Sequence, residues 1–110
     1  MIATFVQDAD TIDYTAMADL AAGDVVVINE LVAIAKQAIP NNTVGSLATE
    51  GIFEVPKATG AGTAISGGMK VYWDPVAKIA TATPGILKYL GKTVRNAADA
   101  DTTVRVRLQQ

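Results

Sequence analysis

Apolar and polar residues alternate along several short stretches of this chain, and a period of two is typical of half-buried β-strands. In Thr11–Thr15 the side chains of Ile12 and Tyr14 share one face, and Asp13 lies on the other. In Val104–Leu108 two arginines take the polar positions. Glycine, proline, asparagine and aspartate bound these stretches, as turns require. The pattern predicts a chain of short antiparallel strands.

The most explicit turn signal lies between two apolar runs. Val25–Ile28 and Leu31–Ala35 are separated by Asn29-Glu30, which predicts a β-hairpin with a two-residue turn. Composition alone would also fit a helix over residues 32–39. The valine-rich run before it and the turn at Asn29 favour a strand.

Two longer alternating runs follow in the middle of the chain. Their apolar or small faces comprise Leu47, Thr49, Gly51, Phe53 and Val55 in the first run, and Met69, Val71 and Trp73 in the second. The opposite faces carry Glu50, Ile52 and Glu54, then Lys70, Tyr72 and Asp74. An Asp74-Pro75 turn leads into a further strand at Lys78–Thr83. We expect Trp73 to fill the core and Tyr72 to face a contact surface.

Helix is expected only as single turns, at Ala16–Ala22 and Thr63–Ser66. A weak internal repeat appears at an offset of 44 residues (67 − 23 = 44). The matching pairs are Gly23/Gly67, Val27/Val71, Val32/Val76, Ala33/Ala77, Ala38/Ala82 and Pro40/Pro84. Chance similarity between two hairpins rich in alanine and valine is the competing explanation. A true repeat would imply two related hairpins that close a small barrel or sandwich.

The composition excludes several classes of chemistry. The 110 residues include no cysteine and no histidine, which removes thiol nucleophiles, disulfides, the usual zinc ligands and the commonest general base. The start of the chain has no basic region followed by an apolar run, and no apolar run is long enough to span a bilayer. We therefore expect a soluble, unexported protein without a membrane partner.

The charge distribution is asymmetric. The net charge of −2 argues against binding to nucleic acid, which normally needs a basic excess. Residues 1–35 hold six acids and no base, whereas residues 36–95 hold seven bases and three acids. This asymmetry would suit self-assembly, with the acidic end of one copy against the basic face of another. Simple solvation of both regions is the alternative.

Three segments resemble ligand-binding motifs. Gly85–Thr93 nearly spells the phosphate loop G-x-x-x-x-G-K-[ST], but five residues separate Gly85 from Gly91 and the interior has strand character. Glycines 60, 62, 67 and 68 are better explained by turns. The acids at 8, 10 and 13 lack the central glycine and final glutamate of a calcium loop. We expect no catalytic residue, metal or cofactor.

The chain resembles the phage and prophage capsid cement (decoration) proteins, long catalogued as a domain of unknown function. The resemblance is carried by Phe5–Gln7, Asp10–Thr15, Ala22–Val27, Leu47–Gly60, Gly68, Val71–Asp74 and Thr103–Leu108. The family also carries the label of a predicted RecA/RadA-family phage recombinase. Two departures concern the first loop: Ala9 stands where glycine is expected, and Ala16–Ala22 is unusually rich in alanine.

The resemblance implies a structural virion protein that binds the outer surface of the assembled phage capsid and stabilises it by bridging capsid subunits. Its partners would be the major capsid protein and further copies of itself, with a homotrimer as the first choice and a dimer as the second. It would be made in the host cytoplasm. One alternative is a recombination accessory that binds nucleotide or single-stranded DNA. Another is a different virion part, such as a head-fibre base or a tail protein.

We expect a single all-β domain over residues 1–110, either a small β-barrel or a β-sandwich, with an extended arm at residues 1–8 that orders on binding. Candidate capsid or subunit contacts are Ile2, Phe5, Val6, Glu54, Lys57, Tyr72, Arg105 and Arg107. Arg105 and Arg107 would either bind an acidic partner or keep an edge strand soluble.

Overall fold

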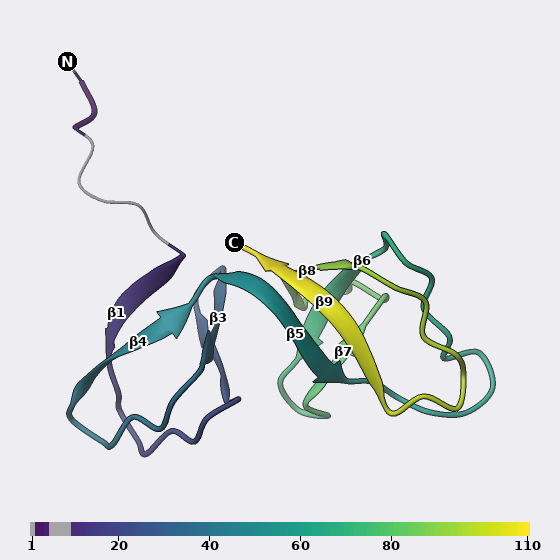
Figure 1. Ribbon diagram of the computed structural model, residues 1–110, viewed down its shortest axis with the longest axis horizontal. Helices are drawn as coiled ribbons and strands as arrows, with labels where there is room; N and C mark the ends of the chain where they lie inside the picture. The colour runs from purple at the N-terminus through teal and green to yellow at the C-terminus, as the bar shows by residue number, and fades with distance from the viewer. Residues whose placement is uncertain (1, 5–9) are drawn as a thin grey trace.

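The computed structural model describes residues 2–4 and 10–110, and they form two antiparallel sheets (Figure 1). The strands are β1 (Thr11–Thr15), β2 (Val25–Ile28), β3 (Leu31–Ala35), β4 (Val44–Ala48), β5 (Glu50–Pro56), β6 (Lys70–Asp74), β7 (Ile79–Thr81), β8 (Lys88–Thr93) and β9 (Thr103–Gln109). The four-stranded sheet has the order β1-β4-β3-β2, and the five-stranded sheet has the order β5-β9-β8-β6-β7. The prediction of an all-β fold of short antiparallel strands is confirmed.

Within the described ranges, no helix is long and apolar enough to cross a membrane. The single helical turns predicted at Ala16–Ala22 and Thr63–Ser66 are wrong. The backbone in both segments bonds to a distant loop instead: Leu20 N donates to Ile39 O at 2.9 Å, and Ile65 N donates to Ala97 O at 2.9 Å. Each bond is one half of an isolated antiparallel bridge.

The hairpin predicted on both sides of Asn29 is confirmed, with Val25 opposite Ile34 and Ile28 opposite Leu31. Asn29 has a φ of 53°, a left-handed conformation that asparagine tolerates better than most residues. The turn after β6 is longer, because residues 75–78 join Asp74 to Ile79, and Lys78 there also has a positive φ of 57°. Sequence and turn geometry agree at both hairpins.

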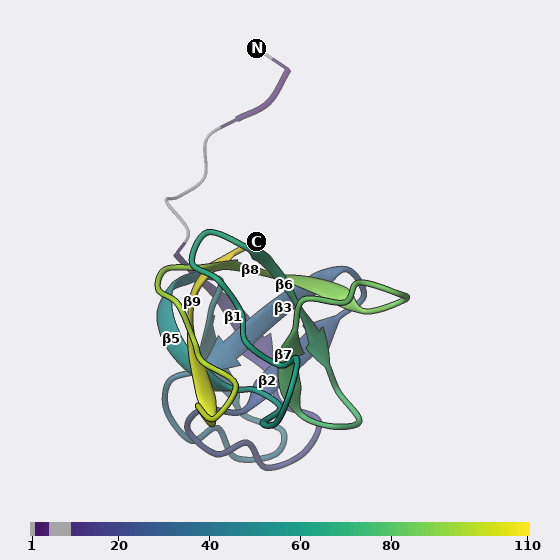
Figure 2. The same ribbon diagram turned by 90° about the vertical axis from the view of Figure 1, so that its right-hand side faces the viewer.

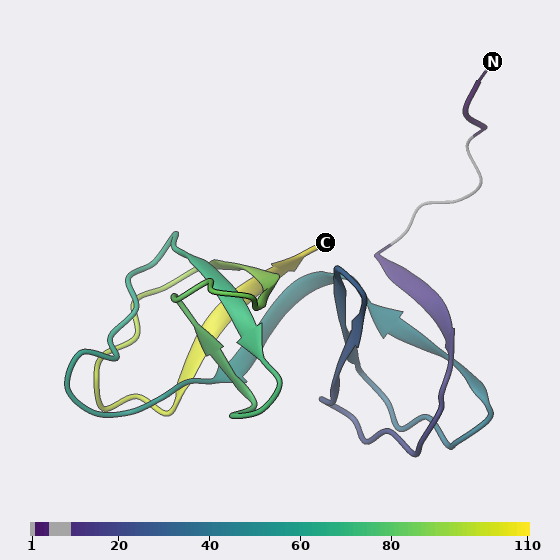
Figure 3. The same ribbon diagram turned by 180° about the vertical axis from the view of Figure 1, so that it is seen from behind.

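The chain passes from one sheet to the other at Thr49. Ala48 pairs with Thr11 and Ile34 in the four-stranded sheet, whereas Glu50 pairs with Gln109 in the five-stranded sheet. The run predicted as one alternating stretch from Leu47 is therefore divided between two sheets. Figure 3 shows β5 leaving the end of β4 and crossing to the second sheet.

The five-stranded sheet is strongly curled, as the end-on view in Figure 2 shows. One parallel bridge, between Lys57 and Ala80, connects the end of β5 to β7. The pairing of β6 with β8 contains a bulge, because Val71 pairs with Gly91 but Tyr72 pairs with Tyr89. This bulge adds to the bend of the sheet. Apart from this bridge, the edge strands β5 and β7 do not pair with each other. The sheet therefore does not close into a barrel, and the arrangement is closer to a sandwich.

The main core lies between the two sheets. The four-stranded sheet supplies Val32, Ile34 and Ala48, and the five-stranded sheet and its loops supply Val55, Ile65, Val71, Trp73, Ala80, Leu90, Ala97, Val104, Val106 and Leu108. Trp73 is only 7% exposed, which confirms its predicted role in the core. A smaller cluster of Ala16, Ala33, Ala35, Ile39 and Leu47 lies on the other face of the four-stranded sheet.

The weak internal similarity at an offset of 44 residues does not correspond to a structural repeat, in agreement with the explanation by chance. Both hairpins exist, but β4 pairs with β3, the second strand of its hairpin, whereas β8 pairs with β6, the first strand of its hairpin. Val32 is fully buried in β3, while its predicted counterpart Val76 is 92% exposed in a turn. The similarity reflects two hairpins of similar composition.

Candidate functional site

The segment that resembles a phosphate loop is a strand. Residues Lys88–Thr93 form β8, and the Gly91 backbone packs against that of Arg107 so closely that a Cβ atom would overlap with its carbonyl. The Thr93 hydroxyl is buried, donates to Ser66 O at 2.6 Å and accepts from Met69 N at 3.0 Å. This hydroxyl is therefore committed to holding a loop, and the backbone N–H groups of β8 are not arranged to bind a phosphate.

The glycine-rich region 60–68 consists of turns, as predicted. Gly60, Gly62 and Gly68 have φ values of 113°, 81° and 81°, which L-residues rarely adopt. Among the residues that the structure describes, no three acidic side chains come close enough to hold a metal ion. Asp8, one of the three acids compared with a calcium loop, lies outside the described residues.

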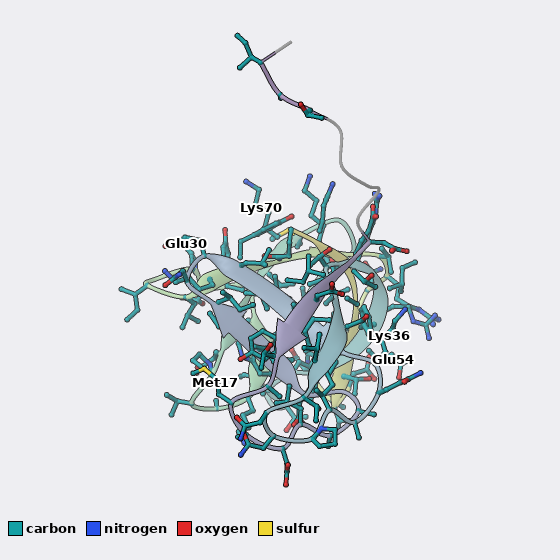
Figure 4. All side chains as sticks on the ribbon, turned by 90° about the vertical axis from the view of Figure 1, so that its left-hand side faces the viewer. Met17, Glu30, Lys36, Glu54 and Lys70 are labelled. Carbon is teal, nitrogen blue, oxygen red and sulfur yellow. The ribbon has the colours of Figure 1, made fainter. Side chains whose placement is uncertain are left out.

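The surface with the greatest concentration of charged and aromatic side chains is the outer face of the five-stranded sheet, on the side away from the core. It carries Glu50, Ile52, Glu54, Lys70, Tyr72, Tyr89, Lys92, Arg105 and Arg107. Four of the residues predicted as contacts, Glu54, Tyr72, Arg105 and Arg107, come from three different strands and meet on this face. Because the sheet curls, the face turns through a wide angle, and Figure 4 shows Lys70 and Glu54 pointing in different directions.

The two arginines of β9 bind acids of the neighbouring strand. Arg105 Nη2 lies 2.8 Å from Glu54 Oε1, and Arg107 Nη2 lies 3.7 Å from Glu50 Oε1. Of the two alternatives for Arg105 and Arg107, protection of an edge strand is wrong, because β9 lies between β5 and β8. The acidic groups closest to both arginines therefore belong to the same chain, and these exposed pairs contribute little to stability.

Tyr72 lies half-buried on the outer face, as its alternation with Trp73 predicts. Its ring meets that of Tyr89 edge to face, with centroids 6.1 Å apart and an interplanar angle of 68°. Edge-to-face packing is a favoured geometry for aromatic pairs, and tyrosine combines an apolar ring with a polar hydroxyl group. The two tyrosines therefore form an aromatic patch next to the charged positions.

Lys57 differs from the expectation for a contact residue, because it is 95% buried (5% exposed). Its Nζ donates to three backbone carbonyl oxygens, those of Ala58 at 2.7 Å, Ala98 at 3.0 Å and Asp101 at 3.0 Å. A buried ammonium needs such acceptors. The contacts join the loop after β5 to the loop before β9, so Lys57 holds the fold and exposes almost no surface to a partner.

Of the three candidates in the N-terminal arm, Ile2 is fully exposed. Phe5 and Val6 lie outside the described residues. The role of the arm therefore stays a prediction.

Sequence reasoning did not select Lys70, Lys92 and Tyr89, which share the outer face with the predicted contacts. Lys70 alternates with Val71 exactly as Tyr72 alternates with Trp73, so the same periodicity identifies it. The bulge in β8 hides the other two, because it places Tyr89 and Lys92 on one face although three positions separate them.

An apolar groove of about 530 Å³ lies at the junction of the two sheets. Val25, Ile34, Phe53 and Trp73 are among the residues that line it, and charged residues such as Lys78 lie at its border. This lining suits an apolar segment and offers no nucleophile with an adjacent base.

Comparison with known proteins identifies a family for this chain. The family model described as phage cement protein matches residues 6–108, which is 103 of the 110 residues (108 − 6 + 1 = 103). Neither the curated proteins nor the solved structures gave a match. The match covers β1 to β8 and all of β9 except its last residue, Gln109. Because the family model matches nearly the whole chain, the chain belongs to the phage cement protein family.

Proposed function

We propose that this protein binds the outer surface of the assembled phage capsid and stabilises the shell by bridging capsid subunits. Family membership gives the chain a structural, capsid-associated role, and that membership is the observation that carries the proposal. The bridging role adds a mechanism: disruption of the shell must also break the cement contacts. Because the protein binds the assembled shell in preference to free subunits, it stabilises the assembled state by mass action.

The outer face of the five-stranded sheet is the proposed surface for contacts with capsid subunits or with neighbouring copies of the protein. It is rigid, since it consists of paired strands, and it presents charges of both signs beside the Tyr72–Tyr89 pair. Tyrosine and arginine are enriched among the residues that dominate protein interfaces. We assign Glu54, Tyr72, Arg105 and Arg107 to this surface and Ile2, Phe5 and Val6 to an arm that orders on the shell.

Many copies on one shell would make a modest affinity sufficient. A symmetric oligomer would match the symmetric positions of a shell. A trimer is preferred to a dimer, because shells offer threefold and quasi-threefold positions. Binding at these positions would also require many copies in each particle, comparable in number with the capsid subunits. A tail or head-fibre component would be present in far fewer copies.

The test uses purified shells assembled without this protein, to which the protein is added back. We expect the shells with bound protein to resist higher temperature and lower salt than the bare shells, and to bind it in proportion to the number of capsid subunits. Equal resistance of the two kinds of shell would refute the proposal. A copy number of a dozen or fewer would instead indicate a tail or fibre component.

A further inference from the structure

Three cationic side chains lie in a row across the five-stranded sheet. Lys70 of β6 is directly opposite Lys92 of β8, and Lys92 is directly opposite Arg107 of β9. Like charges at directly opposite positions destabilise a sheet. Arg107 has Glu50 nearby, but within the described part of the chain neither lysine forms an ion pair. We call Lys70, Lys92 and Arg107 the basic row.

Most acidic side chains, in contrast, have a partner within the same chain. Nearly all of those described are engaged inside the chain, either by a cation or by backbone N–H groups: Asp19, Asp24, Glu30, Glu50, Glu54, Asp74, Asp99 and Asp101. Within residues 2–4 and 10–110, only Asp10 and Asp13 have no such contact through the side chain. Asp13 lies in β1 and Asp10 directly precedes it, and both are exposed. We call these two residues the acidic edge.

The acidic edge and the basic row cannot meet within one molecule. β1 is an edge strand of the four-stranded sheet, and β6 and β8 belong to the other sheet. Figure 1 shows β1 at one end of the molecule and β6 in the sheet at the opposite end. Among the described residues, Lys36, Lys78 and Arg95 also lack an ion pair, but only Lys70 and Lys92 lie directly opposite another cation. The two unmatched acids lie far from these two lysines, so the two groups are complementary only between copies.

We propose that the acidic edge of one copy binds the basic row of a second copy. The inference rests on the proposed function and deepens it, because it names the surface through which neighbouring copies on a shell touch each other. The contact joins two different surfaces, so repetition around a symmetry axis closes a ring. The carboxylates of the second copy would also relieve the repulsion along the row.

Exposed ion pairs are individually weak and are screened by salt. The contact is therefore expected at low salt and high protein concentration in solution, and on a shell where copies are held close together. A phosphate backbone is the other polyanion that such a row attracts. Copies of the chain are favoured, because Glu50 and Glu54 lie on the same outer face and would repel a long polyanion.

The experiment joins carboxylates to amines with a zero-length carbodiimide in an equal mixture of ¹⁴N- and ¹⁵N-labelled protein, at low salt and on shells. Mixed-isotope peptide pairs identify links between copies. We expect links from Asp10 or Asp13 to Lys70 or Lys92, and we expect K70E/K92E to lose them. The quadruple variant D10K/D13K/K70E/K92E restores complementarity with the signs exchanged, and it should regain links between the same two segments.

The control K36E/K78E changes the net charge by the same amount at two exposed lysines outside the row, and Figure 4 shows Lys36 away from Lys70. It should keep the links. The inference is overturned if wild-type protein gives no mixed-isotope link, if K36E/K78E loses the links as K70E/K92E does, or if the row retains single-stranded DNA at low salt in place of a second copy.

Shell binding is measured in parallel, which separates the two proposals. Wild-type protein that binds and stabilises shells without links between copies would refute only the inference. Links between copies in solution, without any binding to shells, would refute only the proposed function.

Discussion

The side chain of Gln110 binds Val32 across the boundary between the two sheets. Gln110 Oε1 accepts a hydrogen bond from Val32 N at 2.8 Å, and its Nε2 donates to Tyr89 O and Leu90 O, each at 2.9 Å. β3 pairs with β4 only through Ile34 and Ala35, so Val32, which pairs with Val27 of β2, lies beyond the part of β3 that pairs with β4. One amide thus links β3 of the first sheet to β8 of the second.

Substitution of Gln110 by alanine removes all three bonds and leaves partly buried backbone groups unpaired. We expect Gln110→Ala to lower the free energy of unfolding by about 1–2 kcal/mol, measured by urea denaturation. Gln109→Ala is the matched control, because Gln109 is exposed at the end of β9, and it should change stability by less than about 0.5 kcal/mol. Equal effects of the two substitutions would show that the amide does not join the sheets.

Lys57 offers a second test, because its ammonium group is the common partner of carbonyl oxygens from two loops. Lys57→Met keeps much of the apolar stem and removes the charge, so those carbonyls lose their donor. We expect a loss of about 2–3 kcal/mol, together with faster proteolysis within residues 58–64. Lys70→Met, at an exposed position, should be nearly neutral. A neutral Lys57→Met would contradict the assigned role.

Ile39 packs directly on Gly45. A Cβ atom at position 45 would lie 2.6 Å from Ile39 Cδ1 and 2.7 Å from its Cγ1, closer than such atoms can approach. We expect Gly45→Ala to destabilise the protein by about 1–3 kcal/mol through overpacking. Ile39→Ala removes the clash, so the double variant should lose less stability than the sum of the two single variants. Simple additivity in thermal or urea unfolding would argue against the contact.

Gly91 is required for the pairing of β8 with β9, because its backbone packs against Arg107. A methyl group there would meet backbone atoms that cannot rotate away, so Gly91→Ala is expected to cost about 3 kcal/mol. Gly67→Ala is the control, since a Cβ atom there would come no closer than 3.4 Å to its neighbours. Unfolding monitored through the fluorescence of Trp73, the single tryptophan, compares the two variants. Similar midpoints would contradict the prediction.

The orientation of many residues on the proposed contact surface could be predicted from alternation alone. Alternation predicted that Tyr72 and Trp73 lie on opposite faces of one strand. It also predicted that the arginines of β9 lie on the face away from its valines and leucine. The structure confirms both orientations. It did not predict that these residues share one face with Lys70 and Lys92. That grouping depends on strand order, and strand order is set by contacts between segments far apart in the sequence.

The segment that resembles a phosphate loop also shows that strand neighbours cannot be predicted from the sequence alone. Spacing argued against a loop around Gly91, and pairing with β9 shows why the glycine is present: only a residue without a side chain fits against Arg107. Lys57 also illustrates it. Lys57 was predicted as a contact residue, and only the approach of residues 98–101 surrounds its ammonium group with carbonyl acceptors.

The sequence by itself determined the strands, the hairpin turn at Asn29, the buried tryptophan and the absence of histidine and cysteine chemistry, because each depends on local periodicity, local turn geometry or composition. Only the tertiary structure decided that the chain changes sheet at Thr49, that β9 is central and that the basic row forms. The physical reason is that backbone N–H and C=O groups are the same in every strand. Side-chain alternation fixes which face of a strand is buried, but packing of the whole chain chooses its neighbours.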